Sequence, residues 1–343
     1  MKVVIRADAG IEQGTGHVMR CLTLSEELLA RGHQVDLVTG GLATDWLAEA
    51  VAISGVGLHH CEFDTLPVDR IIALKPDWVV VDSYQIPSCS LSALAEFTPL
   101  LAVVDGDYRG IQASLYLDQN LGAESVVRPV AIRDRFLSGA KFTLVRDSVL
   151  AERRPGPSGE ISSTPRVLTF MGGTDPTHAS LGIAEALAKI EDDFELVILA
   201  PSSEHSALRT ALGAKLHVRL LAPTRELPAL FSEADVIVSA AGTSAWDICA
   251  IGIPAVLISV VENQRTSVRE AVSRGLALGL DVTDDRSALQ ENAGELVSRL
   301  LHDTELRRRL SQKCLSTFDG DGKGRVADVM EAKGDMYASV RRR

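Results

Sequence analysis

Close to the N-terminus the chain reads Gly14-Thr15-Gly16-His17-Val18-Met19-Arg20-Cys21. A short apolar run at 3–7 precedes this stretch and an amphipathic run ending at 31–33 follows it, which predicts a strand, a glycine-rich turn and a helix. In such a turn the backbone N–H groups can converge on an anionic or sugar ligand. The stretch is not a dinucleotide-binding G-x-G-x-x-G motif, because Met19 stands where the third glycine would be. This unit predicts an α/β fold with a ligand site at its first turn.

The alternation of strand and helix patterns continues along the whole chain. In the first half, strands are predicted at 3–7, 34–39, 58–61, 78–82, 100–104 and 114–117, with helices near 17–31, 44–53, 66–75 and 88–97. In the second half, strands are predicted at 167–171, 195–199, 217–221, 236–239, 255–259 and 277–280, with helices near 177–189, 204–212, 226–233, 244–251, 263–274 and 287–301. Continuously apolar strands such as 79–81 are typical of parallel sheets covered on both faces. We therefore expect two Rossmann-like, doubly wound α/β domains that face each other across a cleft.

A change of composition at 151–166 indicates the boundary between these domains. The segment is rich in Pro, Gly and Ser and lacks the regular spacing of apolar residues seen in helices and strands. Such a segment is typical of an exposed linker. The sequence predicts an N-terminal domain at 1–152, a linker at 153–165, a second domain at 166–315 and a helical tail at 316–343.

The net charge and the cysteines exclude several classes of function. The chain has 343 residues and a formal net charge of −11 at pH 7, which argues against nucleic acid and anionic lipid as partners because both need a basic face. The five cysteines are scattered without a C-x-x-C pair, so we expect reduced thiols, and we expect neither a metal nor a cofactor. Met1-Lys2 leads directly into a strand and no apolar run reaches the length of a membrane span, so we expect a cytoplasmic protein. The oligomeric state stays open between a monomer and a weak dimer.

His17 is the candidate general base. It lies in the first turn of a predicted helix, where the positive end of the helix dipole disfavours the imidazolium form. A neutral imidazole can accept a proton from an attacking hydroxyl group. The alternative is a solvent-facing histidine that is only tolerated at the start of the helix.

Two further turns join a predicted strand to a predicted helix in the second half. In Met171-Gly172-Gly173-Thr174-Asp175-Pro176, Gly173 and Thr174 suit close approach to a diphosphate, whereas Asp175 and Pro176 suit a helix cap. Both roles are compatible.

The second of these turns covers 239–247 and is rich in small residues. Ser244 lies at its helix start, and Asp247 can accept hydrogen bonds from both ribose hydroxyls or simply complement the helix dipole. Asn263 and Gln264 begin the next helix, where their amides can bind the same ligand.

Polar residues also follow strands of the first half. Asp8, Asp82 and Asp105 lie where apolar strands end, which is the edge at which ligands bind in such folds. Their expected role is to support loops and hold the glycine-rich turn in shape. Tyr84 is the better ligand candidate, because a phenol offers both an apolar face and a hydroxyl.

Together these motifs resemble one family, the UDP-2,4-diacetamido-2,4,6-trideoxy-β-L-altropyranose hydrolases of pseudaminic acid biosynthesis. The matching segments are Arg6-Ala7-Asp8, Gly14 to Leu22, Val81-Asp82-Ser83-Tyr84, Gly172-Gly173-Thr174-Asp175, Trp246-Asp247 and Asn263-Gln264. Such proteins belong with the two-domain glycosyltransferase-like (GT-B) superfamily, which includes the peptidoglycan N-acetylglucosaminyltransferase and spore-coat polysaccharide proteins.

This resemblance implies that UDP binds the second domain and that the sugar faces the first. His17 would activate water for inverting attack at the anomeric carbon without a metal, with Gly16 leaving space for the sugar, Arg20 in the same motif and Tyr84 beside the sugar. Gly173 and Thr174 would lie near the diphosphate and Asp247 near the ribose, while Asn263 would reach the phosphate or the sugar. The sequence departs from the family in two places. Asp247 stands where Glu is usual, and Glu12-Gln13 stand where relatives more often have small or apolar residues.

Three functions are compatible with these features. The first is hydrolysis of a UDP-linked 2,4-diacetamido-2,4,6-trideoxyhexose to UDP and free sugar. The second is a GT-B glycosyltransferase that uses a UDP-sugar donor in surface or spore-coat polysaccharide synthesis, because the same scaffold suits both reactions. The third is a non-catalytic nucleotide-sugar binding protein, which would leave His17 without a chemical role.

Overall fold

The computed structural model describes residues 1–213 and 217–341, and the chain divides into two compact units. The first unit contains Met1–Arg146 and the C-terminal segment from Gly320, and the second contains Asp147–Asp319. The division falls between Arg146 and Asp147, ahead of the predicted linker at 153–165. The predicted tail also differs, because its residues from 320 onward fold with the first unit, while 342–343 lie outside the described residues.

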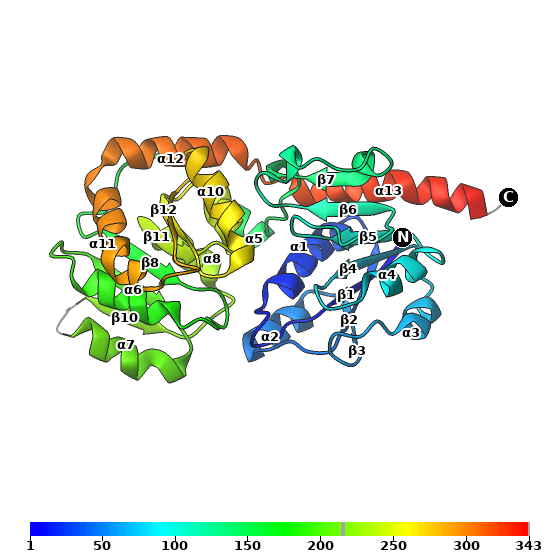
Figure 1. Ribbon diagram of the computed structural model, residues 1–343, viewed down its shortest axis with the longest axis horizontal. Helices are drawn as coiled ribbons and strands as arrows, with labels where there is room; N and C mark the ends of the chain where they lie inside the picture. The colour runs from blue at the N-terminus through cyan, green and yellow to red at the C-terminus, as the bar shows by residue number, and fades with distance from the viewer. Residues whose placement is uncertain (214–216, 342–343) are drawn as a thin grey trace. The chain divides into compact units, whose positions relative to one another are not determined.

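A seven-stranded parallel sheet forms the centre of the first unit (Figure 1). Its order is β3-β2-β1-β4-β5-β6-β7. The strands are β1 (Lys2–Ala7), β2 (Gln34–Thr39), β3 (Gly57–His60), β4 (Trp78–Asp82), β5 (Leu100–Val103), β6 (Leu115–Asp118) and β7 (Phe136–Ser138). The helices are α1 (Gly16–Ala30), α2 (Asp45–Ile53), α3 (Val68–Ala73), α4 (Ser88–Ala95) and α13 (Gly322–Arg341), with 3₁₀ turns η1 (Ala123–Ser125), η2 (Arg133–Arg135) and η3 (Ala140–Phe142).

Alternate residues of this sheet enter two different hydrophobic cores. Ile5 of β1 packs in one core with Leu24 of α1 and Met330 of α13. Its neighbour Val4 packs in the other core with Leu91 of α4. The strands are continuously apolar because both faces of the sheet are covered, as the sequence predicted.

The C-terminal helix α13 belongs to the first of these cores and lies along α1 (red in Figure 1). Val326 and Met330 of α13 are fully buried. At the end of α1, Arg31 donates hydrogen bonds to Asp328 at 2.7 Å and to Glu331 at 3.0 Å. Burial of the apolar side chains stabilises this packing, and the exposed ion pairs add little to it.

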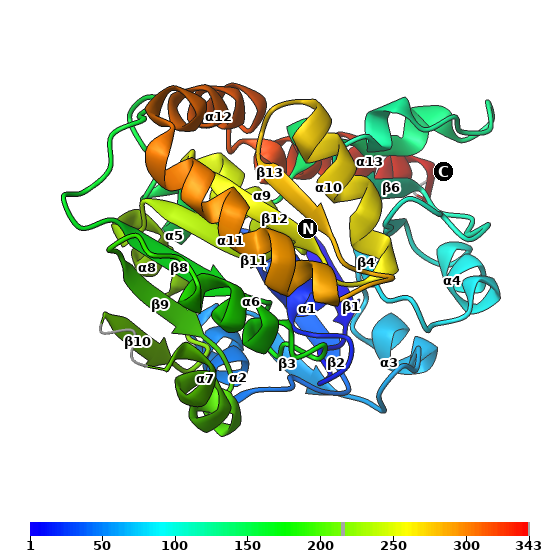
Figure 2. The same ribbon diagram turned by 60° about the vertical axis from the view of Figure 1, so that its left-hand side comes forward.

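The second unit repeats the architecture with a six-stranded parallel sheet in the order β10-β9-β8-β11-β12-β13 (Figure 2). The strands are β8 (Arg166–Phe170), β9 (Glu195–Leu199), β10 (Val218–Leu221), β11 (Val236–Ala240), β12 (Ala255–Ser259) and β13 (Leu278–Asp281). The helices are α5 (Asp147–Leu150), α6 (Ala179–Ala188), α7 (His205–Leu212), α8 (Leu227–Glu233), α9 (Ser244–Ile251), α10 (Arg265–Ser273), α11 (Ser287–His302) and α12 (Thr304–Thr317), with η4 (Ser202–Glu204) and η5 (Glu262–Gln264). Helices α6 and α11 lie side by side in both views. The two predicted doubly wound α/β domains are therefore confirmed.

The structure differs from the predicted elements in the segment that follows β6. No element was predicted there, yet it contains β7 and the turns η1 to η3. The helix predicted from 177 begins at Ala179, so Pro176 lies outside it and is not its first residue. Across 1–213 and 217–341, no helix combines the length and the apolar character that crossing a bilayer requires.

Both sheets share a strand order that reverses at one point. The first strand of each sheet lies between the second and the fourth, so the reversal falls between β1 and β4 in the first unit and between β8 and β11 in the second. In open parallel sheets, ligands bind beside the carboxyl ends of the strands at such a point. Ligands are therefore expected beside the loops after β1 and β4 in the first unit and after β8 and β11 in the second. Together with the starts of the helices that follow them, these loops carry Asp8, His17, Tyr84, Gly173, Thr174, Ser244 and Asp247.

Candidate functional site

The loop that joins β1 to α1 is a tight turn held to the neighbouring loop. Gly14 has φ +76° and donates a backbone hydrogen bond to the carbonyl of Gly10 at 2.9 Å. Ala9 donates to the carbonyl of Gly41 at 3.0 Å. The positive φ at Gly14 favours glycine, which explains why this residue type begins the motif. The turn places His17 one residue inside α1.

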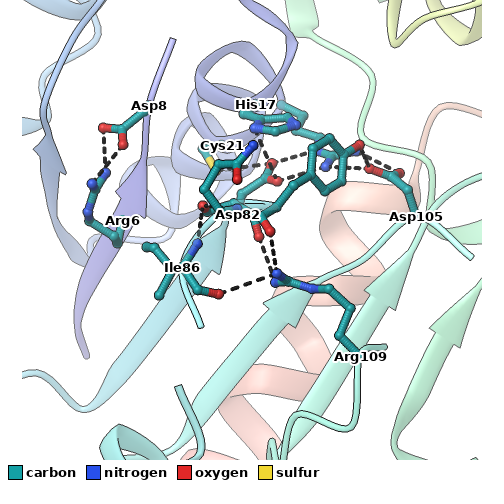
Figure 3. A network of polar contacts seen from close by, with 12 residues as sticks. Arg6, Asp8, His17, Cys21, Asp82, Ile86, Asp105 and Arg109 are labelled. Carbon is teal, nitrogen blue, oxygen red and sulfur yellow. Dashed lines mark hydrogen bonds and ion pairs between the residues drawn. The ribbon is translucent and has the colours of Figure 1, made fainter. Parts of the chain in front are cut away.

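His17 lies beside a carboxylate and a phenol (Figure 3). Its Nδ1 is 3.9 Å from Oδ1 of Asp82, and its ring contacts the ring of Tyr84 edge-on, with centroids 4.6 Å apart. The His17 side chain is 12% exposed, so solvent or a substrate can still reach it. The negative charge of Asp82 would stabilise an imidazolium formed by proton transfer to His17.

Arg20 joins Asp82, the carboxylate beside His17, to a second carboxylate, Asp105. Arg20 donates to Asp82 at 2.5 and 2.7 Å and to Asp105 at 3.0 and 2.9 Å. Because Arg20 is 4% exposed and makes all four of these hydrogen bonds, its geometry suits a positioning role better than direct contact with substrate. Asp82 and Asp105 therefore hold the Arg20 side chain of α1, and their support of the glycine-rich turn stays a prediction.

Asp105 is the centre of this network. Burial opposes its ionisation, but the charge of Arg20 and hydrogen bonds from Arg20, Tyr84 and Asn120 hold the pKa of its carboxyl well below the usual range. The Tyr84 hydroxyl donates to Oδ2 of Asp105. Burial, followed by the charge of Asp105, raises the pKa of Tyr84, so its phenol remains a hydrogen-bond donor at neutral pH.

The structure separates Asp8 from this network. Asp8 accepts hydrogen bonds from Arg6 at 2.5 and 2.7 Å, from the backbone of Gly40 at 2.6 Å and from that of Asp64 at 2.9 Å. These bonds tie the loop after β2 to the loop after β3. Although burial opposes it, the combined effect of Arg6 and the two backbone donors lowers the pKa of Asp8. Asp8 therefore holds loops in place, which is its expected role.

Two residues of the network were missed by sequence reasoning. Asn120 follows β6 and donates to Asp105 at 2.6 Å, and Arg109 reaches the backbone of the Tyr84 loop. Asn120 could have been found, because it stands beyond the end of a strand like the three predicted aspartates. Arg109 carries no such signal, because it lies within a loop and its partners are backbone carbonyls.

In the second unit, the loop after β8 combines a helix cap with an unpaired hydroxyl. Gly172 has φ +87°, and the carboxylate of Asp175 accepts hydrogen bonds from the backbones of Ala179 at 3.0 Å and Ser180 at 2.9 Å. The predicted capping by Asp175 is therefore confirmed. Within the described chain, Oγ1 of Thr174 is buried without a hydrogen-bond partner. A buried hydroxyl without a partner is unfavourable, and a ligand oxygen would satisfy it.

The loop after β11 brings small residues close to Gln264. The Oε1 of Gln264 accepts a hydrogen bond from the backbone of Val260 at 2.9 Å, and its Nε2 would lie 4.0 Å from a Cβ added at Gly242. Ser244 begins α9 and is half-buried.

The two remaining predicted contacts of this unit differ in exposure. Asn263 is exposed in η5, whereas Asp247 in the first turn of α9 is only 5% exposed. In the part of the chain that the structure describes, no three His, Cys, Asp or Glu side chains are grouped to hold a metal ion.

Comparisons with known proteins agree with this architecture. No family model matches the chain. The chain is 24% identical over 362 residues to the spore coat polysaccharide biosynthesis protein SpsG of Bacillus subtilis, covering 98% of this chain and 99% of that protein. It superimposes on a UDP-GlcNAc 2-epimerase from Neisseria meningitidis bound to UDP-GlcNAc with a TM-score of 0.67 and 14% identity, covering 97% of this chain and 100% of the other. For the calicheamicin glycosyltransferase CalG4 the TM-score is 0.60 at 19% identity, with 96% and 97% covered. The chain therefore has the fold of two Rossmann-like domains known as GT-B.

Proposed function

We propose that this protein transfers a sugar from a UDP-sugar donor to an acceptor hydroxyl in polysaccharide synthesis. The observation that carries the chemistry is the position of His17, which lies at the strand-order reversal with its ring against Tyr84 and its Nδ1 3.9 Å from Asp82. The similarities to known proteins favour a sugar acceptor over water. The full-length similarity to a spore coat polysaccharide biosynthesis protein supports a role in polysaccharide synthesis. Structural similarity to a glycosyltransferase and to an epimerase bound to UDP-GlcNAc supports a UDP-sugar as the donor.

In this proposal His17 acts as general base. The acceptor oxygen forms a bond to the anomeric carbon while its proton passes to the imidazole of His17. The bond from the anomeric carbon to the diphosphate oxygen breaks, and UDP leaves with the electron pair. Attack from the side opposite the diphosphate inverts the anomeric configuration. Asp82 stabilises the imidazolium that results.

The second unit supplies the UDP contacts in this proposal. Gly173 and Thr174 bind the diphosphate through backbone N–H groups and the buried hydroxyl of Thr174, and the start of α9 at Ser244 adds the partial positive charge of a helix N-terminus. Asp247 accepts hydrogen bonds from the ribose hydroxyls. Asn263 and Gln264 add amide donors.

Hydrolysis is the second candidate, in which water takes the place of the acceptor hydroxyl. Its support is that residues carrying the resemblance to UDP-sugar hydrolases meet in one network, where Arg20 joins Asp82 to Asp105 and Asp105 binds the Tyr84 hydroxyl. The proton transfer to His17 is the same for both acceptors, so the position of His17 does not distinguish them. The choice depends on whether a sugar acceptor or water is bound beside it.

The experiment incubates the purified protein in H₂¹⁸O with UDP-GlcNAc or a UDP-linked 2,4-diacetamido-2,4,6-trideoxyhexose, with and without a panel of saccharide acceptors. Transfer predicts UDP release that depends on the acceptor and a glycoside that carries no ¹⁸O. Hydrolysis predicts UDP release without acceptor and ¹⁸O at the anomeric carbon of the free sugar. His17→Gln should lose turnover in either case, and His302→Gln is its matched control, because the His302 side chain is 69% exposed at the end of α11. If calorimetry detected no binding of UDP or of either UDP-sugar, both candidates would be wrong.

A further inference from the structure

Arg109 makes a set of contacts that the proposed chemistry does not use. It lies in the loop between β5 and β6, and its guanidinium donates to three backbone carbonyls of the loop that follows β4 (Figure 3). Nη1 binds the carbonyl oxygens of Tyr84 at 2.6 Å and Ile86 at 3.3 Å, and Nη2 binds that of Ser83 at 2.7 Å. These three acceptors surround Tyr84 in the chain, so Arg109 fixes the backbone from which the Tyr84 side chain extends.

The other end of Tyr84 is held from the same loop. Its hydroxyl donates to Asp105, which precedes Arg109 by four residues and lies two residues after the end of β5. Both the backbone and the hydroxyl of Tyr84 are therefore bound by the segment that leaves β5. The Tyr84 ring lies between these two attachments in the side chain and contacts the His17 ring edge-on at an interplanar angle of 80°.

The chemistry of these contacts requires a guanidinium. Carbonyl oxygens that point toward one place repel each other unless a cation lies among them, and the planar fork of Arg donates along several fixed directions at once. A lysine ammonium carries the same charge, but it is a single point on a flexible chain and cannot match this pattern. Within the loop, the Ser83 hydroxyl accepts from the backbones of Gln85 and Ile86, each at 3.2 Å, so local bonds shape the turn while Arg109 attaches it to the β5 loop.

We infer that Arg109 is a positioning residue, which holds the Tyr84 ring against His17 by clamping the backbone at 83–86. The geometric part of this inference is independent of the reaction. Its kinetic consequence rests on the proposed function, because His17 is the base there and Tyr84 limits the orientations of its ring.

The test measures the position of the Tyr84 ring directly. A ring at 4.6 Å shifts the NMR signals of the His17 ring protons through its ring current. Carbon–proton correlation spectra resolve the eight histidines, and His17→Gln identifies the His17 signal by its loss. Tyr84→Leu defines the chemical shift of His17 without the ring. Arg133→Ala is the control, because this arginine belongs to the same unit and its side chain is 62% exposed.

The expected result is that Arg109→Ala moves the His17 signal most of the way to its position in Tyr84→Leu, while Arg133→Ala leaves it at the wild-type position. Arg109→Lys is measured in parallel, because it keeps the charge and the aliphatic chain and is the safer variant for folding. It should move the signal in the same direction at an unchanged melting temperature. A His17 signal at the wild-type position in both Arg109 variants would overturn the inference.

Kinetics then separates this inference from the proposed function. If His17 is the base, Arg109→Lys should lower kcat roughly 10–100-fold by misplacing the reacting groups, with UDP affinity unchanged. If the wild-type protein turns over no UDP-sugar while the His17 signal still moves in the Arg109 variants, the proposed function fails and the positioning role stands. A displaced His17 signal with wild-type kcat would refute the kinetic consequence alone.

Discussion

Replacing Arg20 with methionine would test the buried charge network of Arg20, Asp82 and Asp105 beside His17. Methionine keeps the unbranched apolar stem of the side chain but removes the guanidinium, with its charge and its four hydrogen bonds to Asp82 and Asp105. The side chains of Asp82 and Asp105 are 1% and 12% exposed, so neither can recover full hydration. Removing one partner of a buried ion pair costs about 3–5 kcal/mol, because the remaining charge is left uncompensated. We expect Arg20→Met to destabilise the first unit by that amount at pH 7.

The loss should depend on pH in a definite direction. In the wild-type protein the pKa of Asp105 is held below its ordinary value, so Asp105 contributes stability above its unfolded-state pKa of about 3.9 and loses this contribution as the pH falls through its folded-state pKa. In Arg20→Met, burial raises the pKa of Asp105, and protonation relieves the uncompensated charge. The stability difference between the two proteins should therefore be largest at neutral pH and shrink as the pH falls from 7 toward 4.5. Adding Asp105→Asn to Arg20→Met should recover part of the loss at pH 7.

The assay is urea unfolding at several pH values, with hydrogen exchange of the peptide that contains β4 to identify the transition of the first unit. Arg133→Met is the control, because the side chain of Arg133 is 62% exposed and its loss should change stability by less than about 0.5 kcal/mol. A loss below about 1 kcal/mol at pH 7, or a loss that stays constant between pH 7 and 4.5, would refute the reasoning.

Three further predictions concern catalysis and the UDP contacts. His17→Gln should lower turnover by about 10²–10⁴-fold while UDP affinity stays unchanged, and wild-type turnover would remove His17 from the role of base. Thr174→Val should weaken UDP binding about fivefold in calorimetry without lowering the melting temperature, because the buried hydroxyl lacks a partner among the described residues; equal affinity would place the diphosphate elsewhere. Asp247→Asn should reduce the preference for UDP over 2′-deoxy-UDP about tenfold, and an unchanged preference would mean that this carboxylate only complements the start of α9.

Much of the fold could be predicted from the sequence because its signals are local. Continuous apolar runs such as 79–81 indicate strands buried on both faces. The structure confirms this burial, because separate hydrophobic cores cover the two faces of the sheet. The turn before α1 could be located because Gly14 has a positive φ, a conformation that favours glycine, and the helix begins two residues later at Gly16. The polar residues at strand ends followed from the strand order of doubly wound sheets. That order places such residues at one edge of the sheet.

Which residues join into one network was decided by tertiary structure. Arg20 binds Asp105 across 85 positions of the chain, and α13 packs against α1 after the whole second unit has intervened. The periodic pattern of apolar residues in the sequence does not indicate such pairings. They depend on how the strands assemble and on which buried charges remain to be neutralised. The sequence by itself determined the two parallel α/β domains and the turn that carries His17. Only the folded chain assigned Arg20 to the support of Asp82 and Asp105, and Arg109 to the backbone of Tyr84, because a guanidinium donates to whichever carboxylates or carbonyls the fold brings within its reach.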